Sequence, residues 1–209
     1  MYLAAWQAAH IPRWLLARRL WIESRTLFVF INSMAVLETA RLILRPFGEE
    51  DVDPLAELMA NRDFMRFSLG AFSREQTAAF LKKTLGWNSA GLPSLFAVLV
   101  RENSKLIGYC GFFHQEVDGT NEIEIAYRLH PDYWGRGLAT EAARAVRDHA
   151  FRDLKLPRVI SLIQPDNLPS RRVAEKNAMK IEKKTVHRGF PTFVFAITRE
   201  QWQTKRAVG

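Results

Sequence analysis

Apolar and polar residues alternate along this chain with two different periods, beginning at Leu37. A period of two predicts a strand, whereas apolar residues three and four positions apart predict a helix. The expected strands cover 37–47, 95–100, 105–114, 121–129, 159–163, 179–187 and 192–198. The expected helices start at Asp51 and Ser73 and cover 136–154 and 170–177. Because this order mixes hairpins with one strand–helix–strand crossover, it predicts one α/β domain built on a mixed sheet.

The strand expected at 121–129 has two faces of different character, because successive side chains of a strand point to opposite sides. One face is mostly apolar and consists of Ile123, Ile125, Tyr127 and Leu129. The other face consists of Glu122, Glu124, Ala126 and Arg128. The first face is therefore expected to join the core, and the second to face a cleft.

A glycine-containing turn connects this strand to the next helix. Gly135 and Gly137 lie where the helix begins, and unpaired N–H groups at a helix N-terminus attract phosphate. Glycine leaves the backbone open to a phosphate group. The turn lacks the Lys-Ser/Thr of a Walker loop, and Thr140 stands where a Rossmann fingerprint has its third glycine. Taken alone, the turn is equally a simple strand-to-helix connection.

A second motif follows the apolar run 159–163. Asn167 or Ser170 could cap the next helix, and Pro169 suits its first turn. Capping is one interpretation of these polar side chains, and ligand binding is the other.

These two motifs occur together with further runs at a defined spacing. The runs are LETARLILRPF (37–47), LIGYCG (106–111), EIAYRLHP (124–131), DYWGRGLATEA (132–142), N-x-x-S (167–170) and VFAITREQW (194–202). Together they resemble the Gcn5-related N-acetyltransferase (GNAT) superfamily, most closely its RimJ/RimL-like branch, which acetylates ribosomal-protein N-termini. The resemblance covers roughly residues 37–202. It implies a mixed, mostly antiparallel central sheet flanked by helices and splayed between the strand before the glycine loop and the next strand.

The resemblance also implies that acetyl-CoA is the cofactor. The loop would hold its pyrophosphate, and its pantetheine would pair with the strand 124–129, where a backbone N–H near Ala126 or Tyr127 could polarise the thioester carbonyl. The residues expected to bind the cofactor are Ala126, Tyr127, Leu129, Trp134, Gly135, Arg136, Gly137, Leu138, Ala139, Thr140 and Asn167.

Two residues are expected to be catalytic. Glu124 occupies the position of the family's acidic residue and would take the proton from the amine, with Glu122 in reserve. The alternative for Glu124 is an acid on a solvated strand face. Much of the superfamily has a tyrosine where this chain has Ala174, so Ser170 is expected to stabilise the departing thiolate instead.

Two further positions depart from the family pattern. Trp134 replaces the usual Gln or Arg, which backbone phosphate contacts would tolerate. Asn177 and Ala178 occupy a region where a glycine usually ends the helix, and Asn177 is expected to adopt the left-handed conformation.

Composition narrows the function only slightly. The net charge is +8, and without residues 1–33, which hold four arginines and one acidic residue, it is +5. That excess suits an anionic cofactor or a ribosomal environment, but it is too small to indicate direct nucleic-acid binding. The single Cys110 excludes an intrachain disulfide. His114 and His187 have no neighbours in the sequence that indicate a metal site.

Residues 1–33 differ from the rest of the chain, with three tryptophans in a segment of low polarity through which four arginines are scattered. This pattern argues against a secretory signal. A transit-like or membrane-surface helix is one interpretation. The preferred interpretation is a mis-assigned start, with translation from Met34 and an acetyltransferase domain at 34–209. No run is long enough to span a membrane.

Three functions are compatible with these features. The first is acetyl transfer to a protein N-terminal α-amine, in the cytoplasm, by a monomer or homodimer. The second is acetyl transfer to a small-molecule amine such as an antibiotic, a polyamine or an amino-acid derivative. The third is a non-catalytic acyl-CoA-binding module.

Overall fold

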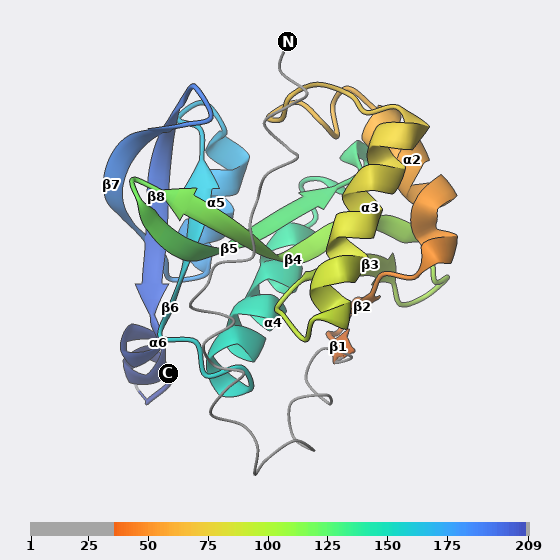
Figure 1. The fold of residues 1–209 in the computed structure, drawn as a ribbon. Coiled ribbons are helices and arrows are strands. Elements are labelled where there is room, and N and C mark those ends of the chain that lie inside the picture. Colours follow the sequence, from red (N-terminus) through yellow and green to blue (C-terminus); the bar gives the residue numbers. More distant parts are fainter. Residues whose placement is uncertain (1–35, 208–209) are drawn as a thin grey trace.

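The alternating runs pair into one eight-stranded sheet within residues 36–207, the part of the chain that the computed structural model describes (Figure 1). The strands are β1 (Leu37–Glu38), β2 (Leu42–Pro46), β3 (Leu95–Val100), β4 (Leu106–Val117), β5 (Thr120–Leu129), β6 (Arg158–Ile163), β7 (Lys180–His187) and β8 (Phe190–Thr198). Their order across the sheet is β1-β2-β3-β4-β5-β6-β8-β7, and β5–β6 is the parallel pair. The predicted mixed, mostly antiparallel sheet is therefore confirmed. The segment 1–33, with its expected alternative start, lies outside the described residues.

Helices cover both faces of the sheet (Figure 1). They are α2 (Val52–Ala60), α3 (Arg74–Ser89), α4 (Leu138–Arg152), α5 (Leu168–Lys176) and α6 (Arg199–Ala207), with 3-10 turns η3 (Glu49–Asp51) and η4 (Pro131–Tyr133). The helices α2 and α3 pack Leu55 and Leu81 against one face of the sheet. On the other face, Val146 of α4 packs in a cluster with Phe112 and Ile125. The apolar side of β5, the strand before the glycine loop, therefore joins the core, as its alternation predicts.

The sheet splays between β5 and β6. Their registered backbone pairing consists of Glu124↔Ile160, whereas β5 pairs with β4 from Thr120 to Leu129. Just beyond that pair, the Ser161 hydroxyl donates to the Ile125 carbonyl at 2.7 Å. The next hydrogen bond between β5 and β6 therefore comes from a side chain, at the point where the backbone pairing ends. The edge of β5 after Ile125 has no strand partner on this side within the described residues.

The prediction of one continuous strand at 37–47 is wrong. The chain folds back at Thr39, and β1 pairs with β2 through Leu37↔Leu44. The Thr39 backbone N–H donates to the Leu42 carbonyl at 3.0 Å, and its hydroxyl accepts from the Leu42 N–H at 2.9 Å. These local bonds give the backbone a turn as an alternative to extended pairing.

The end of α5 also differs from the prediction. Asn177 has φ −90°, and Ala178 takes the left-handed conformation instead, with φ 66°. The buried Asn177 amide donates to the Val173 carbonyl at 2.9 Å, so the side chain itself satisfies a carbonyl of the last helical turn. The short helix α6 was not predicted; it follows β8 directly, and Trp202 is the one large apolar residue in its otherwise mostly polar sequence.

Candidate active site

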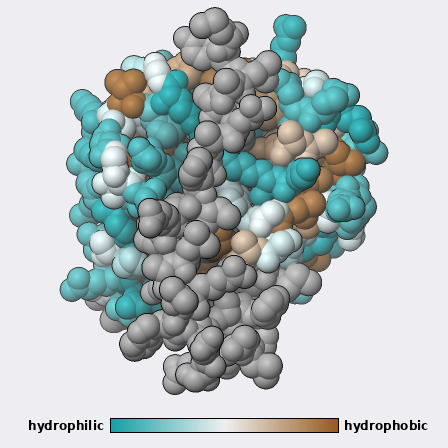
Figure 2. All heavy atoms as spheres, viewed as in Figure 1, coloured by the Kyte–Doolittle hydropathy of each residue, from teal (hydrophilic) through white to brown (hydrophobic). Residues whose placement is uncertain are grey.

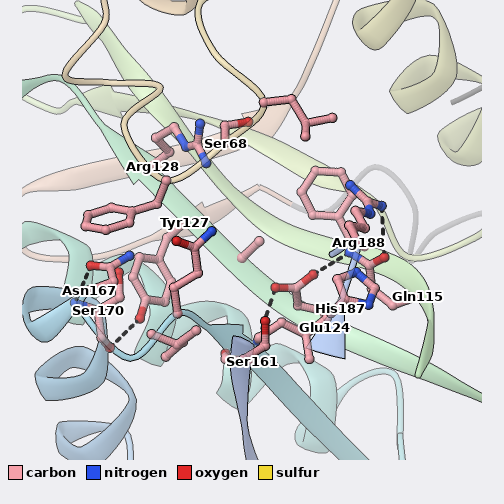
Figure 3. A pocket seen from close by; sticks show the side chains of 18 of the residues that line it. Ser68, Gln115, Glu124, Tyr127, Arg128, Ser161, Asn167, Ser170, His187 and Arg188 are labelled. Atoms are coloured by element: carbon pink, nitrogen blue, oxygen red, sulfur yellow. Dashed lines mark hydrogen bonds between the residues drawn. The ribbon is translucent and has the colours of Figure 1, made fainter. Parts of the chain in front are cut away.

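A cavity of about 210 Å³ opens where β5 and β6 part (Figure 3). Four regions of the chain surround the splayed strands there: the loop after α2, strand β4, the start of α5, and the β7–β8 hairpin. Together with β5, which carries Glu124 and Arg128, they contribute, among others, Phe67, Ser68, Gln115, Asn167, Ser170 and Arg188. The splay therefore brings together residues that lie more than a hundred positions apart.

Glu124 is buried at the point where β5 and β6 part. Its side chain accepts hydrogen bonds from Gln115 Nε2 at 2.6 Å and from the Leu162 backbone N–H at 3.3 Å. Burial raises the pKa of Glu124, and these two hydrogen bonds oppose that rise. The residue is 8% exposed, so the alternative of a solvated strand acid is wrong. The arrangement leaves a carboxylate with a raised pKa facing the cavity, as a general base requires.

The reserve candidate, Glu122, lies on the same face of β5 but points elsewhere. Its carboxylate pairs with Arg158 at 3.1 Å, and it does not line the cavity. Burial raises the pKa of Glu122 as well, and Arg158 counteracts that rise. Of the two carboxylates, Glu124 has access to the cavity.

Two polar residues around Glu124 were missed by the sequence analysis. Arg188 Nη2 donates to Gln115 Oε1 at 3.1 Å, which fixes the Gln115 amide with its NH₂ group toward Glu124 (Figure 3). The predicted strand ended at residue 114, one position before Gln115. Continuing the alternation along β4 would have placed Gln115 on the cleft face.

The start of α5 forms another wall of the cavity. Asn167 caps this helix, because its Oδ1 accepts from the Ser170 backbone N–H at 3.2 Å. Tyr127 donates its hydroxyl hydrogen to the Ser170 backbone carbonyl at 2.8 Å, and burial raises the pKa of Tyr127. Capping is therefore correct for Asn167. Within residues 36–207 the Ser170 hydroxyl has no hydrogen-bond partner, although Ser170 lines the cavity.

The glycine loop turns through two left-handed residues into α4. Gly135 has φ 73°, Gly137 has φ 77°, and the helix starts at Leu138 rather than at the predicted residue 136. Gly137 provides no side-chain cap, so the first N–H groups of α4, from Leu138 to Thr140, are left for a ligand. A Cβ at Gly135 would meet nothing within 4 Å, so the left-handed φ, and not packing, requires glycine there.

The other predicted loop residues have mainly structural contacts. Trp134 is 47% exposed, and its indole N–H donates to the Leu129 carbonyl at 2.7 Å, which fastens the loop to the end of β5. The Arg136 guanidinium lies 5.6 Å from the centre of the Tyr133 ring. Neither contact excludes a ligand on the loop backbone.

The turn between β1 and β2 contacts the glycine loop and the first turn of α4. Arg41 Nη1 donates to the Arg136 carbonyl at 2.9 Å, and Arg41 Nη2 pairs with Glu141 at 2.6 Å. The Thr39 hydroxyl donates to the same carboxylate at 2.6 Å. Burial alone would raise the pKa of Glu141, but the bonds from Thr39 and Arg41 together lower it. These contacts explain why the first strand folds back.

No group of residues suited to hold a metal ion occurs in the part of the chain that the structure describes. None of its described helices is long and apolar enough to cross a membrane.

A family model for the "Acetyltransferase (GNAT) domain" matches residues 41–180. The chain belongs to the GNAT acetyltransferase family. The "Uncharacterized N-acetyltransferase YnaD" of Bacillus subtilis is 32% identical over 173 residues, which are 79% of this chain and 98% of that protein. Both the resemblance seen in the sequence and the assignment as an N-acetyltransferase are thereby confirmed.

Solved GNAT structures share the fold. A GNAT-family acetyltransferase from Bacillus anthracis superimposes with a TM-score of 0.68 at 29% identity, covering 79% of this chain and 99% of that one. RimL, described as "Ribosomal L7/L12 alpha-N-protein acetyltransferase in complex with Coenzyme A", superimposes with a TM-score of 0.68 at 19% identity, covering 80% and 99%. At that identity the likeness to RimL shows the fold alone.

Proposed function

We propose that this GNAT enzyme transfers the acetyl group of acetyl-CoA to a protein N-terminal α-amine, with Glu124 as the general base. The single observation that carries the proposal is the burial of Glu124 in the cavity beside the unpaired edge of β5. A catalytic carboxylate must reach the attacking amine, and Glu124 is the carboxylate that lines this cavity.

The chain's own residues fit coenzyme A. The uncapped N-terminus of α4 suits the pyrophosphate, because its N–H groups and helix dipole both favour negative charge. The open edge of β5 suits the amides of pantetheine, which would pair with it as an added strand. The residues proposed to hold the cofactor are Ala126, Tyr127, Leu129, Trp134, Gly135, Arg136, Gly137, Leu138, Ala139, Thr140 and Asn167. When bound, acetyl-CoA supplies the acetyl group.

Glu124 would take a proton from the acceptor as the amine attacks. A protein α-amine has a pKa of about 7.7–8.0, so much of it is protonated at neutral pH. The raised pKa of Glu124 makes its carboxylate a stronger base than an exposed glutamate. Gln115, held by Arg188, keeps that carboxylate in place.

Ser170 would assist on the other side of the cavity. Its backbone N–H and carbonyl serve Asn167 and Tyr127, whereas its hydroxyl can donate to the departing sulfur. Ala174, at the family's usual tyrosine position, is fully buried in the core. A tyrosine at position 174 could bring its hydroxyl to the cavity only if the surrounding core packed differently.

The peptide acceptor and a cytoplasmic location rest on the RimJ/RimL-like motifs and on the positive charge, which suits a ribosomal environment. The deciding experiment measures CoA release when the full chain is mixed with acetyl-CoA and either ribosomal-protein N-terminal peptides or small amines. Mass spectrometry should locate the new acetyl group on a peptide α-amine. Acetylation of small amines alone would establish the second function instead. Binding of acetyl-CoA without turnover of any amine would establish the non-catalytic module.

A further inference from the structure

We propose that Arg128 forms an anion-binding subsite in the cavity and that the acceptor is a primary amine which also carries a carboxylate. This inference rests on the proposed function for the amine and deepens it by naming the acceptor's chemistry. A carboxylate of that kind could belong to an acidic residue near a peptide N-terminus or to a free amino acid.

The position of Arg128 suits an acceptor contact. Arg128 and Glu124 share one face of β5, and four residues of strand separate them by roughly 13 Å along the backbone. Both side chains line the same cavity, with Ala126 between them on that face. Figure 3 shows Arg128 beside Ser68 and Glu124 beside Gln115, so the two charges lie in different parts of the cavity. An amine near Glu124 would thus leave the rest of the acceptor directed toward Arg128.

The guanidinium of Arg128 has only uncharged partners among the described residues. Its Nη1 lies 3.0 Å from the sulfur of Met65, and its carbon lies 5.9 Å from the centre of the Phe64 ring. A thioether is a weak acceptor, and a guanidinium has five N–H donors. Outside the cavity, Arg41 and Arg158 instead pair with carboxylates. Met65 and Phe64 therefore hold the Arg128 side chain in place, and most of its N–H donors remain available to a ligand.

The charge balance of the cavity points the same way. Its lining contains one carboxylate, Glu124, and two guanidinium groups, Arg128 and Arg188. The lining also contains His187, whose pKa is lowered by burial and then by Arg188, which favours the neutral form. A polycationic acceptor, such as a polyamine or an aminoglycoside, would place positive charge beside Arg128, which has no ion-pair partner among the described residues. An amine with a carboxylate would supply the missing negative charge.

The test uses non-reacting product analogues, so that binding is measured apart from turnover. Calorimetry with the CoA-saturated full chain compares two matched pairs of probes. The first pair is N-acetyl-Ser-Glu-Ala-amide and N-acetyl-Ser-Gln-Ala-amide, and the second is N-acetylalanine and its amide. The protein variants are wild type, Arg128→Gln, Arg128→Lys and Arg62→Gln, an exposed arginine outside the cavity that serves as the matched control.

In the wild type and in Arg62→Gln, the carboxylate member of one pair should bind at least about tenfold more tightly than its amide. Preference within the first pair identifies a peptide acceptor, and preference within the second a free amino acid. Arg128→Gln should abolish the preference, and Arg128→Lys should retain part of it. Acetyl-CoA affinity should stay within a few-fold in all variants.

Three results would overturn the subsite: no preference in either pair, a preference that survives Arg128→Gln, or a tenfold loss of acetyl-CoA affinity in Arg128→Gln, which would assign the guanidinium to the cofactor. CoA release with the unacetylated probes separates the two proposals. Equal turnover of both members of each pair, without a binding preference, contradicts the subsite and leaves acetyl transfer standing. A binding preference without turnover of any amine supports the subsite and contradicts the proposed function.

Discussion

The cleft between β5 and β6 has two ends that are built on different principles. The end proposed for the cofactor is made of backbone: the glycine turns, the uncapped start of α4 and the open edge of β5. The end proposed for the acceptor is made of side chains, which come from the loop after α2, from β4 and β5, and from the β7–β8 hairpin. Figure 2 shows mostly hydrophilic side chains on both flanks of the molecule, with a few apolar residues among them.

This difference affects how substitutions should act. A backbone site depends on conformation, so it tolerates most side-chain changes but not the loss of a left-handed glycine. A side-chain site depends on a few charged and polar groups, so single conservative changes should alter rate and specificity there. The predictions below use that contrast.

Replacing Glu124 with Gln should have the largest effect. Removing a general base typically lowers the rate about 10²- to 10⁴-fold. The affinity for acetyl-CoA should stay within a few-fold, because Gln fills the same space. Steady-state kinetics and calorimetry measure both quantities. Glu116→Gln, an exposed position of β4 on the same hairpin, is the control and should behave as the wild type.

Replacing Gly137 with Val should weaken acetyl-CoA binding at least tenfold, about 1.4 kcal/mol. The side chain would disturb the left-handed turn and obstruct the N-terminus of α4. Gly119 in the β4–β5 turn also has a left-handed φ, of 75°, and open space around it, so Gly119→Val carries a matched strain. If both variants lose affinity equally, the effect is general strain and the loop is not the binding site.

Replacing Ser170 with Ala should lower turnover about two- to tenfold, the range expected for one hydrogen bond. The backbone contacts of Ser170 with Asn167 and Tyr127 survive this change, so the wall of the cavity should stay intact. Ser89→Ala, at an exposed position at the end of α3 outside the cavity, is the control. Wild-type turnover in Ser170→Ala would contradict a catalytic role for Ser170. The Asn167-x-x-Ser170 motif would then serve only to cap the helix α5.

The smallest expected effect is a shift of the pH profile in Arg128→Gln. The positive charges of Arg188 and Arg128 both lower the pKa of Glu124, against the larger raising effect of burial. Removing Arg128 should therefore raise that pKa. Because the base is lost as pH falls through its pKa, the acidic limb of kcat should move to higher pH. An unshifted limb, or a shift equal to that of Arg62→Gln, would contradict this coupling.

The sequence predicted the elements around the end proposed for the cofactor better than those around the end proposed for the acceptor. Strand alternation, two glycines and a capping Asn are local signals, and apart from the first strand each element they predicted lies close to its expected position. Arg188 carries no local signal, and the alternation of β4 could give only the face on which Gln115 lies, because the contacts of both residues form only when β4 and the β7–β8 hairpin meet at Glu124. The first strand was mispredicted for a similar reason, since the contacts of Thr39 and Arg41 with Glu141 span about a hundred residues.

The general-base role of Glu124 is the central claim, and one measurement tests it most directly: kcat against pH for wild type and Glu124→Gln with the same acceptor. We expect the two profiles to differ most near neutral pH and to converge as pH rises, because the acceptor amine then loses its proton without help. Parallel and nearly equal profiles would contradict the account, and Glu124 would then be a buried structural carboxylate with the base elsewhere.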